Sequence, residues 1–353
     1  MKKILFFVPG GVGGAERVTL TITKLIDRSK YSVKLVVLGY KESEITRFIP
    51  EGLDTIYLNM SRMRENSFYK IYRVIKREKP DFVFSSLRFI CIELLIICRF
   101  LCRDTKVVVR AQISPIYLDG RAWHDRLLKA LYPFAHKIVA QTEEMKAEMI
   151  EHYELADDSV QILYNPIDTE TIDSKIRAIN PFENQGAYIY VAIGRCVPQK
   201  GYDILIEAMS DVVEYNPQSQ LYIVGNRDDV EYSKKLDRMV DSFHLAENVH
   251  FVGFNDNPYK FVFNANCFVL SSRNEGLPNV LLEALYLKIP AIATKCIPII
   301  ERLVIDGENG LCVDSEDVEA LSKAMVRIQL LKLTGSKSLY VSASSMEYNN
   351  LFV

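Results

Sequence analysis

Short apolar runs alternate with longer amphipathic stretches along most of the chain. In the first half, the runs predict strands at residues 4–8, 32–38, 82–85, 106–109 and 137–140, and the stretches predict helices at 15–26, 125–132 and 143–152. In the second half, we expect strands at 188–193, 220–224, 249–252, 267–270, 291–294 and 310–313, with helices at 201–209, 231–243, 258–264 and 318–330. This alternation is typical of parallel sheets with helices on both faces.

The length and a change of pattern divide the chain into two domains. At 353 residues it exceeds one ordinary domain. We therefore expect an α/β protein with two tandem Rossmann-like, doubly wound parallel-sheet domains at residues 1–172 and 187–333, joined by a polar linker at 173–186. A serine-rich tail follows at 334–353, and its return to the first domain is one option. Ligands of such sheets bind outside the carboxyl ends of the strands, here in a cleft between the domains.

The segment from Ser271 to Ala284 carries the most distinctive chemistry. It follows the predicted strand at 267–270, and Pro278 stands where a helix can begin. The N–H groups and the dipole of a helix start favour an anion. Glu275 and Glu283 flank that anion site, and carboxylates suit neutral hydroxyls better than phosphate oxygens. A molecule with a central phosphate and sugars at both ends fits this pattern. Chance acids beside a helix start are the alternative.

Cations and glycines follow the first strand of each predicted domain. Arg195 offers a fork of donors and Lys200 a point charge, a pair that suits a diphosphate, although two solvated surface cations are the alternative. Residues 9–17 hold four glycines, which let the backbone approach a ligand closely. A nicotinamide-dinucleotide fingerprint is disfavoured, because Glu16 replaces its third glycine and no acid ends the second strand.

Composition and charge limit the cellular locations and the metal sites that we expect for the protein. The net charge is −2, and the seven cysteines show no metal-ligand spacing. Residues 4–8 are too few for a signal peptide, and the apolar run at 89–101 is too short to span a bilayer. Residues 62–79 predict a basic amphipathic helix, which suits either an anionic lipid surface or a solvated face. We expect a cytoplasmic protein, with a peripheral place on the inner face of the cell membrane as an option.

Short motifs spread over the chain carry a family resemblance. They are Gly13-Gly14-Ala15-Glu16-Arg17, Asn165-Pro166-Ile167-Asp168, Gly194-Arg195 with Gln199-Lys200-Gly201, Val252-Gly253, and Ser272 with Glu275-Gly276-Leu277-Pro278-Asn279 and Glu283-Ala284. Together they resemble the retaining glycosyltransferases of family 4, which have the two-domain GT-B fold. The resemblance covers nearly the whole chain up to Val313.

The resemblance implies a transfer reaction from a nucleotide-sugar, with UDP as the expected nucleotide, and no cofactor or metal. Arg195 and Lys200 would stabilise the leaving diphosphate, Glu275 would bind the transferred sugar and Glu283 the ribose. The other implied substrate-binding residues are Gly13, Gly14, Gly225, Phe254, Gly276, Leu277, Pro278, Asn279 and Val280. The implied acceptor is a growing cell-surface glycan, including one on a lipid carrier, and the implied chemistry is front-face attack assisted by the leaving phosphate. Nucleic acid is not an expected partner.

The chain departs from the family pattern after the predicted strand at 106–109. Many relatives carry a His near the reacting sugar, whereas this chain has Arg110-Ala111-Gln112. We assign Gln112 and Arg110 to the acceptor side, although Gln112 cannot act as a base. Two alternatives to an active transferase stay open: a homologue that binds a nucleotide-sugar without transferring it, and a sugar-nucleotide epimerase of the same fold.

Overall fold

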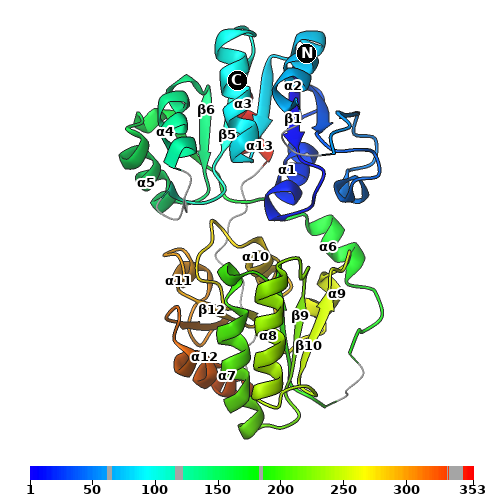
Figure 1. Cartoon of the computed structure of the whole chain (residues 1–353), viewed down its shortest axis with the longest axis vertical. Helices are drawn as coiled ribbons and strands as arrows, with labels where there is room; N and C mark the ends of the chain where they lie inside the picture. The colour runs from blue at the N-terminus through cyan, green and yellow to red at the C-terminus, as the bar shows by residue number, and fades with distance from the viewer. Residues whose placement is uncertain (62–65, 116–121, 183–185, 332, 334–344) are drawn as a thin grey trace. The chain divides into compact units, whose positions relative to one another are not determined.

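The computed structural model describes residues 1–61, 66–115, 122–182, 186–331, 333 and 345–353. Its internal contacts divide the chain into two units, residues 1–167 with 341–353 and residues 168–340. Each unit is a parallel sheet covered by helices (Figure 1), so the predicted fold class is confirmed.

The first unit contains a seven-stranded sheet in the order β3-β2-β1-β4-β5-β6-β7. All its strand pairs are parallel. Two of the strands, β3 and β7, are only three residues long, too short to show a periodic pattern in the sequence. The elements are β1 (Lys2–Val8), α1 (Gly14–Leu25), β2 (Tyr31–Val37), β3 (Thr55–Tyr57), α2 (Ser67–Glu78), β4 (Phe82–Ser85), α3 (Arg88–Phe100), β5 (Lys106–Arg110), α4 (Ala122–Leu131), β6 (Lys137–Ala140), α5 (Glu143–Tyr153), β7 (Val160–Ile162) and α13 (Ser345–Asn349).

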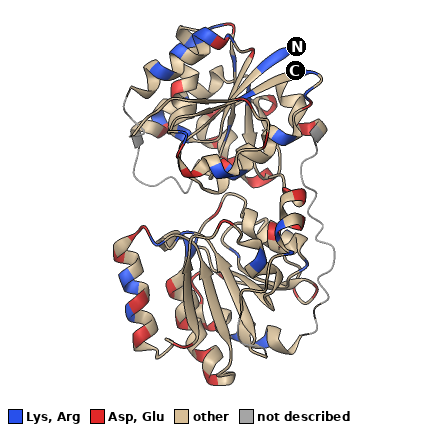
Figure 2. Ribbon diagram, turned by 90° about the vertical axis from the view of Figure 1, so that its right-hand side faces the viewer, with Lys and Arg blue, Asp and Glu red and all other residues tan. Residues whose placement is uncertain are grey.

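The second unit contains a six-stranded sheet in the order β10-β9-β8-β11-β12-β13, again with parallel pairs only. No strand of this sheet contains a charged residue, and Figure 2 shows the charges on helices and loops instead. Such strands are buried on both faces. The elements are α6 (Thr169–Lys175), β8 (Ile189–Ile193), α7 (Tyr202–Tyr215), β9 (Gln220–Val224), α8 (Val230–Ser242), β10 (Val249–Gly253), α9 (Tyr259–Phe263), β11 (Cys267–Leu270), α10 (Asn279–Tyr286), β12 (Ala291–Thr294), α11 (Ile300–Leu303), β13 (Gly310–Val313) and α12 (Val318–Leu330).

Several other segments differ from the sequence-based expectations. Helix α7 continues to Tyr215 instead of ending at residue 209, because Val212 extends its buried face. Residues 169–175, part of which we expected in a linker, form α6 in the second unit. The expected basic helix at 62–79 is α2 from residue 67 onward, and Arg62 and Arg64 lie outside the described residues. Among the described helices, none is both long and apolar enough to cross a membrane.

The end of the chain packs into the first unit. The ring of Phe352 is fully buried, with its centroid 5.5 Å from that of Phe82 and 6.0 Å from that of Phe6. The hydroxyl of Tyr348 donates to the carbonyl of Tyr164 at 2.7 Å. These contacts place Tyr348, Leu351 and Phe352 in the core on one face of the first sheet.

We expect Phe352→Ala to lower the free energy of unfolding of the first unit by about 3–5 kcal/mol, because it removes a buried aromatic ring and leaves a cavity. Urea denaturation measures the change. Val353→Ala is the control, since that side chain is 70% exposed. An unchanged urea midpoint for Phe352→Ala would show that the tail does not contribute to this core.

Candidate functional site

The candidate site of the second unit lies where the strand order of its sheet reverses. Strands β8 and β11 are neighbours there, with connections running to opposite sides. Crevices at the carboxyl ends of such strands are the usual ligand sites of open α/β sheets. Lys200 follows β8 and Glu275 follows β11, so the topology brings together two residues that are 75 positions apart.

Lys200 and Glu275 form a mostly buried ion pair. The Nζ of Lys200 donates to the Oε1 of Glu275 at 2.6 Å, and the hydroxyl of Ser272 donates to the same oxygen at 2.7 Å. The two charged side chains are 18% and 10% exposed. The Oε2 of Glu275 has no hydrogen-bond partner among the described residues. That oxygen is therefore available to accept a hydrogen bond from a ligand hydroxyl.

Gly201 allows the loops after β8 and β11 to approach each other. Its φ is +63°, and a Cβ at this position would lie 2.0 Å from the carbonyl oxygen of Ser271. The hydroxyl of Ser271 donates to the carbonyl of Lys200 at 2.9 Å, and the N–H of Arg273 donates to the carbonyl of Gln199 at 2.8 Å. Any side chain at position 201 would separate the two loops and with them the ion pair.

A second network holds the same two loops through Asp203 and Arg273. The guanidinium of Arg273 donates to both carboxylate oxygens of Asp203, at 2.9 and 3.1 Å, and to the carbonyl of Pro198 at 2.6 Å. Lys235 and the hydroxyl of Tyr232 donate to Asp203 as well, each at 2.7 Å. Burial alone would raise the pKa of Asp203, but the hydrogen bonds from Arg273, Lys235 and Tyr232 hold that pKa well below its usual range.

Sequence reasoning missed this second network. Asp203 stands in the first turn of α7, where an acid is ordinary, and Arg273 stands in a polar loop. Their pairing depends on the sheet order, and no local pattern signals it. The two residues therefore belong to the support of the site.

The start of α10 forms another part of the candidate site. The helix begins at Asn279, directly after Pro278, without a side-chain cap. Glu283 lies in its second turn, and the hydroxyl of Tyr259 donates to the Oε1 of Glu283 at 3.3 Å. Gly276 precedes Leu277 in the loop before the helix, and Leu277 is buried. The loop with Glu275 and the helix with Glu283 thus form one continuous segment after β11.

The remaining predicted residues of the second unit have different surroundings. Arg195 is exposed, and its guanidinium has no ion-pair partner among the described residues, whereas Lys200 is already paired. The two are therefore not an equivalent pair of free cations. A Cβ at Gly225 would lie 1.9 Å from the carbonyl oxygen of Gly194, so the close packing of β8 against β9 requires this glycine. Phe254 is 43% exposed just beyond β10.

The predicted residues of the first unit fall into two groups. Gly13 precedes α1 in an extended conformation, and α1 begins at Gly14 without a side-chain cap. Arg110 is 2% exposed and donates to the side chain of Asn165, which also donates to Gln141 at 3.1 Å. This network ties the carboxyl ends of β5, β6 and β7 together, so Arg110 has a structural partner. Gln112 is half-buried beside it.

Asp203→Asn tests the support network. We expect it to lower the free energy of unfolding by about 3 kcal/mol at pH 7, because it removes the charge of a mostly buried carboxylate and leaves Arg273 with only the more exposed Glu316 as an ion-pair partner among the described residues. Since the folded pKa of Asp203 is depressed, its contribution is present above the unfolded pKa of about 4 and is lost as the pH falls through the folded pKa.

Urea unfolding at pH 7 and at pH 3 measures that difference, which should be smaller at pH 3. The control is Asp237→Asn, because Asp237 is 53% exposed in its pair with Arg227 and such pairs contribute about 0–1 kcal/mol. Equal losses for the two variants at pH 7 would contradict this account of the network.

Comparison with known protein families covers both units. The model described as Glycosyltransferase Family 4 matches residues 12–171, and the model described as Glycosyl transferases group 1 matches residues 173–337. An uncharacterized glycosyltransferase of Methanocaldococcus jannaschii is 30% identical over 65% of this chain. That match spans 59% of the length of the archaeal protein.

Two further matches extend over nearly the whole chain. The N-acetylgalactosamine-N,N'-diacetylbacillosaminyl-diphospho-undecaprenol 4-alpha-N-acetylgalactosaminyltransferase of Campylobacter jejuni is 25% identical over 92% of this chain and 89% of its own. The crystal structure of Anabaena HepE in complex with UDP-glucose has a TM-score of 0.80 at 20% identity, covering 100% of this chain and 98% of that chain. With both units matched by family models and glycosyltransferases similar along its length, the chain belongs to glycosyltransferase family 4 and has the GT-B fold.

Proposed function

We propose that this glycosyltransferase moves one sugar from a UDP-sugar to a growing cell-surface glycan, with retention of the anomeric configuration. The observation that carries the proposal is the Lys200–Glu275 pair at the strand-order reversal of the second unit. A lysine and a carboxylate fixed near a helix start offer one binding group for each part of a nucleotide-sugar. The lysine suits the diphosphate, and the carboxylate suits the sugar hydroxyls.

The chemistry follows from how charge develops during the reaction. When the bond between the anomeric carbon and the phosphate oxygen breaks, negative charge grows on the diphosphate and positive charge on the sugar ring. Fixed cations stabilise the diphosphate charge without reorganisation, and we assign this role to Lys200 and Arg195. The ion pair holds the Nζ of Lys200 in place before the ligand arrives. No metal ion is required in this scheme.

Glu275 has the geometry of a residue that positions the sugar. Its Oε1 already accepts hydrogen bonds from Lys200 and Ser272, which leaves Oε2 for a hydroxyl of the transferred sugar. We assign Glu283 to the ribose hydroxyls and the α10 start, Gly276 to Val280, to the phosphate and sugar. In this scheme the acceptor attacks from the face that the diphosphate leaves, and the leaving phosphate takes the acceptor's proton.

The acceptor in our proposal is lipid-linked, and two observations favour this. The Campylobacter relative is named for an acceptor carried on diphospho-undecaprenol. Helix α2 exposes Phe68 and Tyr69 next to Arg73, whose guanidinium lies 5.9 Å from the ring centroid of Tyr69. Exposed aromatic side chains beside cations suit the interface of an anionic membrane. We therefore propose a peripheral place on the cytoplasmic face of the membrane.

A panel of nucleotide-sugars, tested for slow nucleotide release in the absence of acceptor, checks the donor half of the proposal. We expect release from a UDP-sugar, unaffected by EDTA, and a roughly 100- to 1,000-fold slower rate for Lys200→Ala because a fixed charge beside the leaving group is lost. Lys323→Ala is the control, since Lys323 is 73% exposed on α12. Binding without release from any nucleotide-sugar would favour a non-catalytic homologue, and a changed sugar-nucleotide without acceptor would favour an epimerase.

Vesicle sedimentation tests the membrane proposal. We expect binding to vesicles that contain phosphatidylserine at low salt, and weaker binding of the variant Arg73→Glu with Lys76→Glu, because each basic residue near an anionic surface contributes about 1 kcal/mol. Reversal of two cations on α12, Lys323→Glu with Arg327→Glu, is the matched control. Equal binding by all three proteins would exclude α2 as the contact surface.

A further inference from the structure

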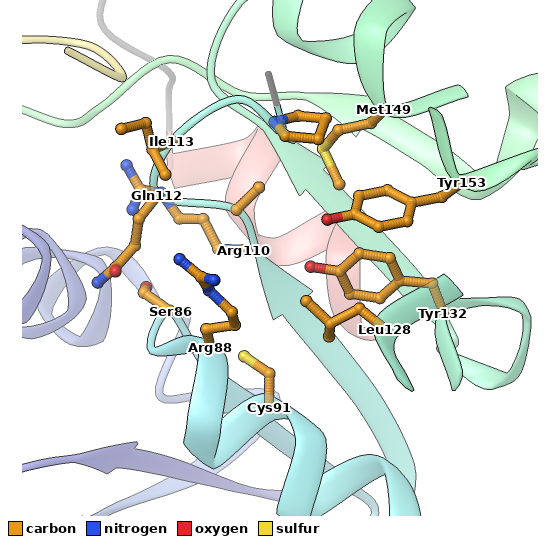
Figure 3. A pocket seen from close by; sticks show the side chains of 12 residues that line it. Ser86, Arg88, Cys91, Arg110, Gln112, Ile113, Leu128, Tyr132, Met149 and Tyr153 are labelled. Atoms are coloured by element: carbon orange, nitrogen blue, oxygen red, sulfur yellow. The ribbon is translucent and has the colours of Figure 1, made fainter. Parts of the chain in front are cut away.

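A pocket within the first unit presents several polar groups that have no hydrogen-bond partner among the described residues. It lies at the carboxyl ends of β4 and β5, beside the starts of α3 and of the loop after β5 (Figure 3). We call it the arginine pocket. Its lining residues are Ser86, Arg88, Cys91, Arg110, Ala111, Gln112, Ile113, Pro115, Leu128, Tyr132, Met149 and Tyr153.

Arg88 is the principal charge of the arginine pocket. It is the first residue of α3, it is half-buried, and its guanidinium has no hydrogen-bond or ion-pair partner among the described residues. Figure 3 shows this guanidinium inside the pocket. Helix α3 also begins here without a side-chain cap, so the positive end of its dipole adds to the same field. A half-buried cation without a counter-ion favours an anionic ligand.

Tyr132 provides an independent indication of a ligand. Its side chain is 7% exposed, yet its hydroxyl has no hydrogen-bond partner among the described residues. The hydroxyl points toward the side of the pocket that holds Arg88 (Figure 3). Burial raises the pKa of Tyr132 well above its usual value, so the phenol stays protonated and can donate a hydrogen bond. This hydroxyl opens onto the pocket, so an oxygen of a ligand there can accept its hydrogen bond.

The other lining residues leave the charge of the pocket positive. Arg110 lines it as well, and none of the described lining residues is Asp or Glu. Burial raises the pKa of Cys91 to about 12, so this thiol carries no negative charge near neutral pH. Among the described residues, two carboxylates are bonded to side chains at the edge of the pocket. Glu148 accepts a hydrogen bond from Ser114, and Asp125 accepts hydrogen bonds from Tyr153 at 2.8 Å and from His152 at 2.8 Å. Asp125 is thus engaged by other side chains and does not neutralise Arg88 directly.

The rest of the arginine pocket indicates what accompanies the anion. The side-chain amide of Gln112 has no partner among the described residues and suits a hydroxyl. Leu128, Met149 and the Tyr153 ring form an apolar wall on the side of the pocket opposite Gln112 and Arg88. We infer that the arginine pocket binds an anionic group of the acceptor, a phosphate or a carboxylate, through Arg88 and Tyr132. This inference rests on the proposed function, because it identifies the acceptor as an anionic one.

Calorimetric titration with two small probes tests the inference. Phenyl phosphate and benzoate share an aromatic ring for the apolar wall and differ in the anion, and benzamide is the neutral control probe. Saturating UDP is present to occupy the donor site. We expect one of the two anions to bind at a single site and benzamide not to bind, and the preferred anion distinguishes a phosphate-bearing acceptor from a carboxylate-bearing one.

Three variants locate that binding. Arg88→Gln should weaken it at least tenfold, because a charge-assisted hydrogen bond is lost. Tyr132→Phe should weaken it about threefold, through loss of one neutral hydrogen bond. Arg103→Gln should not change it, since Arg103 is exposed in the loop after α3. Binding that Arg88→Gln and Tyr132→Phe leave unchanged, or no binding of either anion, would overturn the inference.

Failure of the proposed function would be seen in nucleotide release and not in probe affinity. Lys200→Ala should lose nucleotide release and keep its affinity for the probe, since the arginine pocket contains no residue of the second unit. Absence of nucleotide release from the unaltered protein would end the proposed transfer reaction, whatever the probes show. Loss of probe affinity in Arg88→Gln is read from calorimetry alone and does not depend on turnover.

Discussion

The ion pair between Lys200 and Glu275 is the interaction on which the candidate donor site depends. Both side chains are less than one-fifth exposed, and a charge in such surroundings is costly unless it is paired and hydrogen-bonded. The pair and the hydroxyl of Ser272 meet that condition. The ion pair also joins the loops after the two central strands of the second sheet. The backbone of these loops therefore helps to set the position of each charge.

The surrounding structure keeps this pair in place. Gly201 lets the two loops touch, and the Asp203–Arg273 network fixes them again from the outside. The uncharged strands beneath form a buried, tightly packed base. An enzyme that stabilises charge as it develops requires groups that do not have to reorganise, and this layered support provides them. As a result, many polar side chains in this small region are bonded to one another and serve to hold the loops.

The sequence predicted the sheets well because most strands are continuous apolar runs bounded by turn residues. Strands β9 and β11 occupy the expected residues, 220–224 and 267–270. The short strands β3 and β7 have no such signal, since three residues show no period and their pairing depends on neighbours already in place. The extent of α7 was underestimated because Ser210 and Asp211 interrupt its apolar pattern before Val212 continues the buried face.

The sequence predicted residues of the candidate site, but it did not predict which of them contact each other. Lys200 and Glu275 stand in recognisable motifs, yet their contact follows from the order of the strands. Arg110 looked like a ligand residue in the sequence, whereas its burial against Asn165 gives it a structural partner. Arg88 and Tyr132 carried no signal, because one starts an apolar helical run and the other ends the predicted helix at 125–132. Only the fold shows that both line one pocket and have no hydrogen-bond partner among the residues that the structure describes.

A double-mutant cycle on Lys200 and Glu275 tests the central claim most directly. The rate of nucleotide release would be measured for the unaltered protein, Lys200→Gln, Glu275→Gln and the double variant. If the two residues act as a unit, the double variant is no slower than the slower single variant, because each single change already leaves a buried group without its partner. Rate losses that multiply in the double variant would show that the two residues act independently, and would contradict the account.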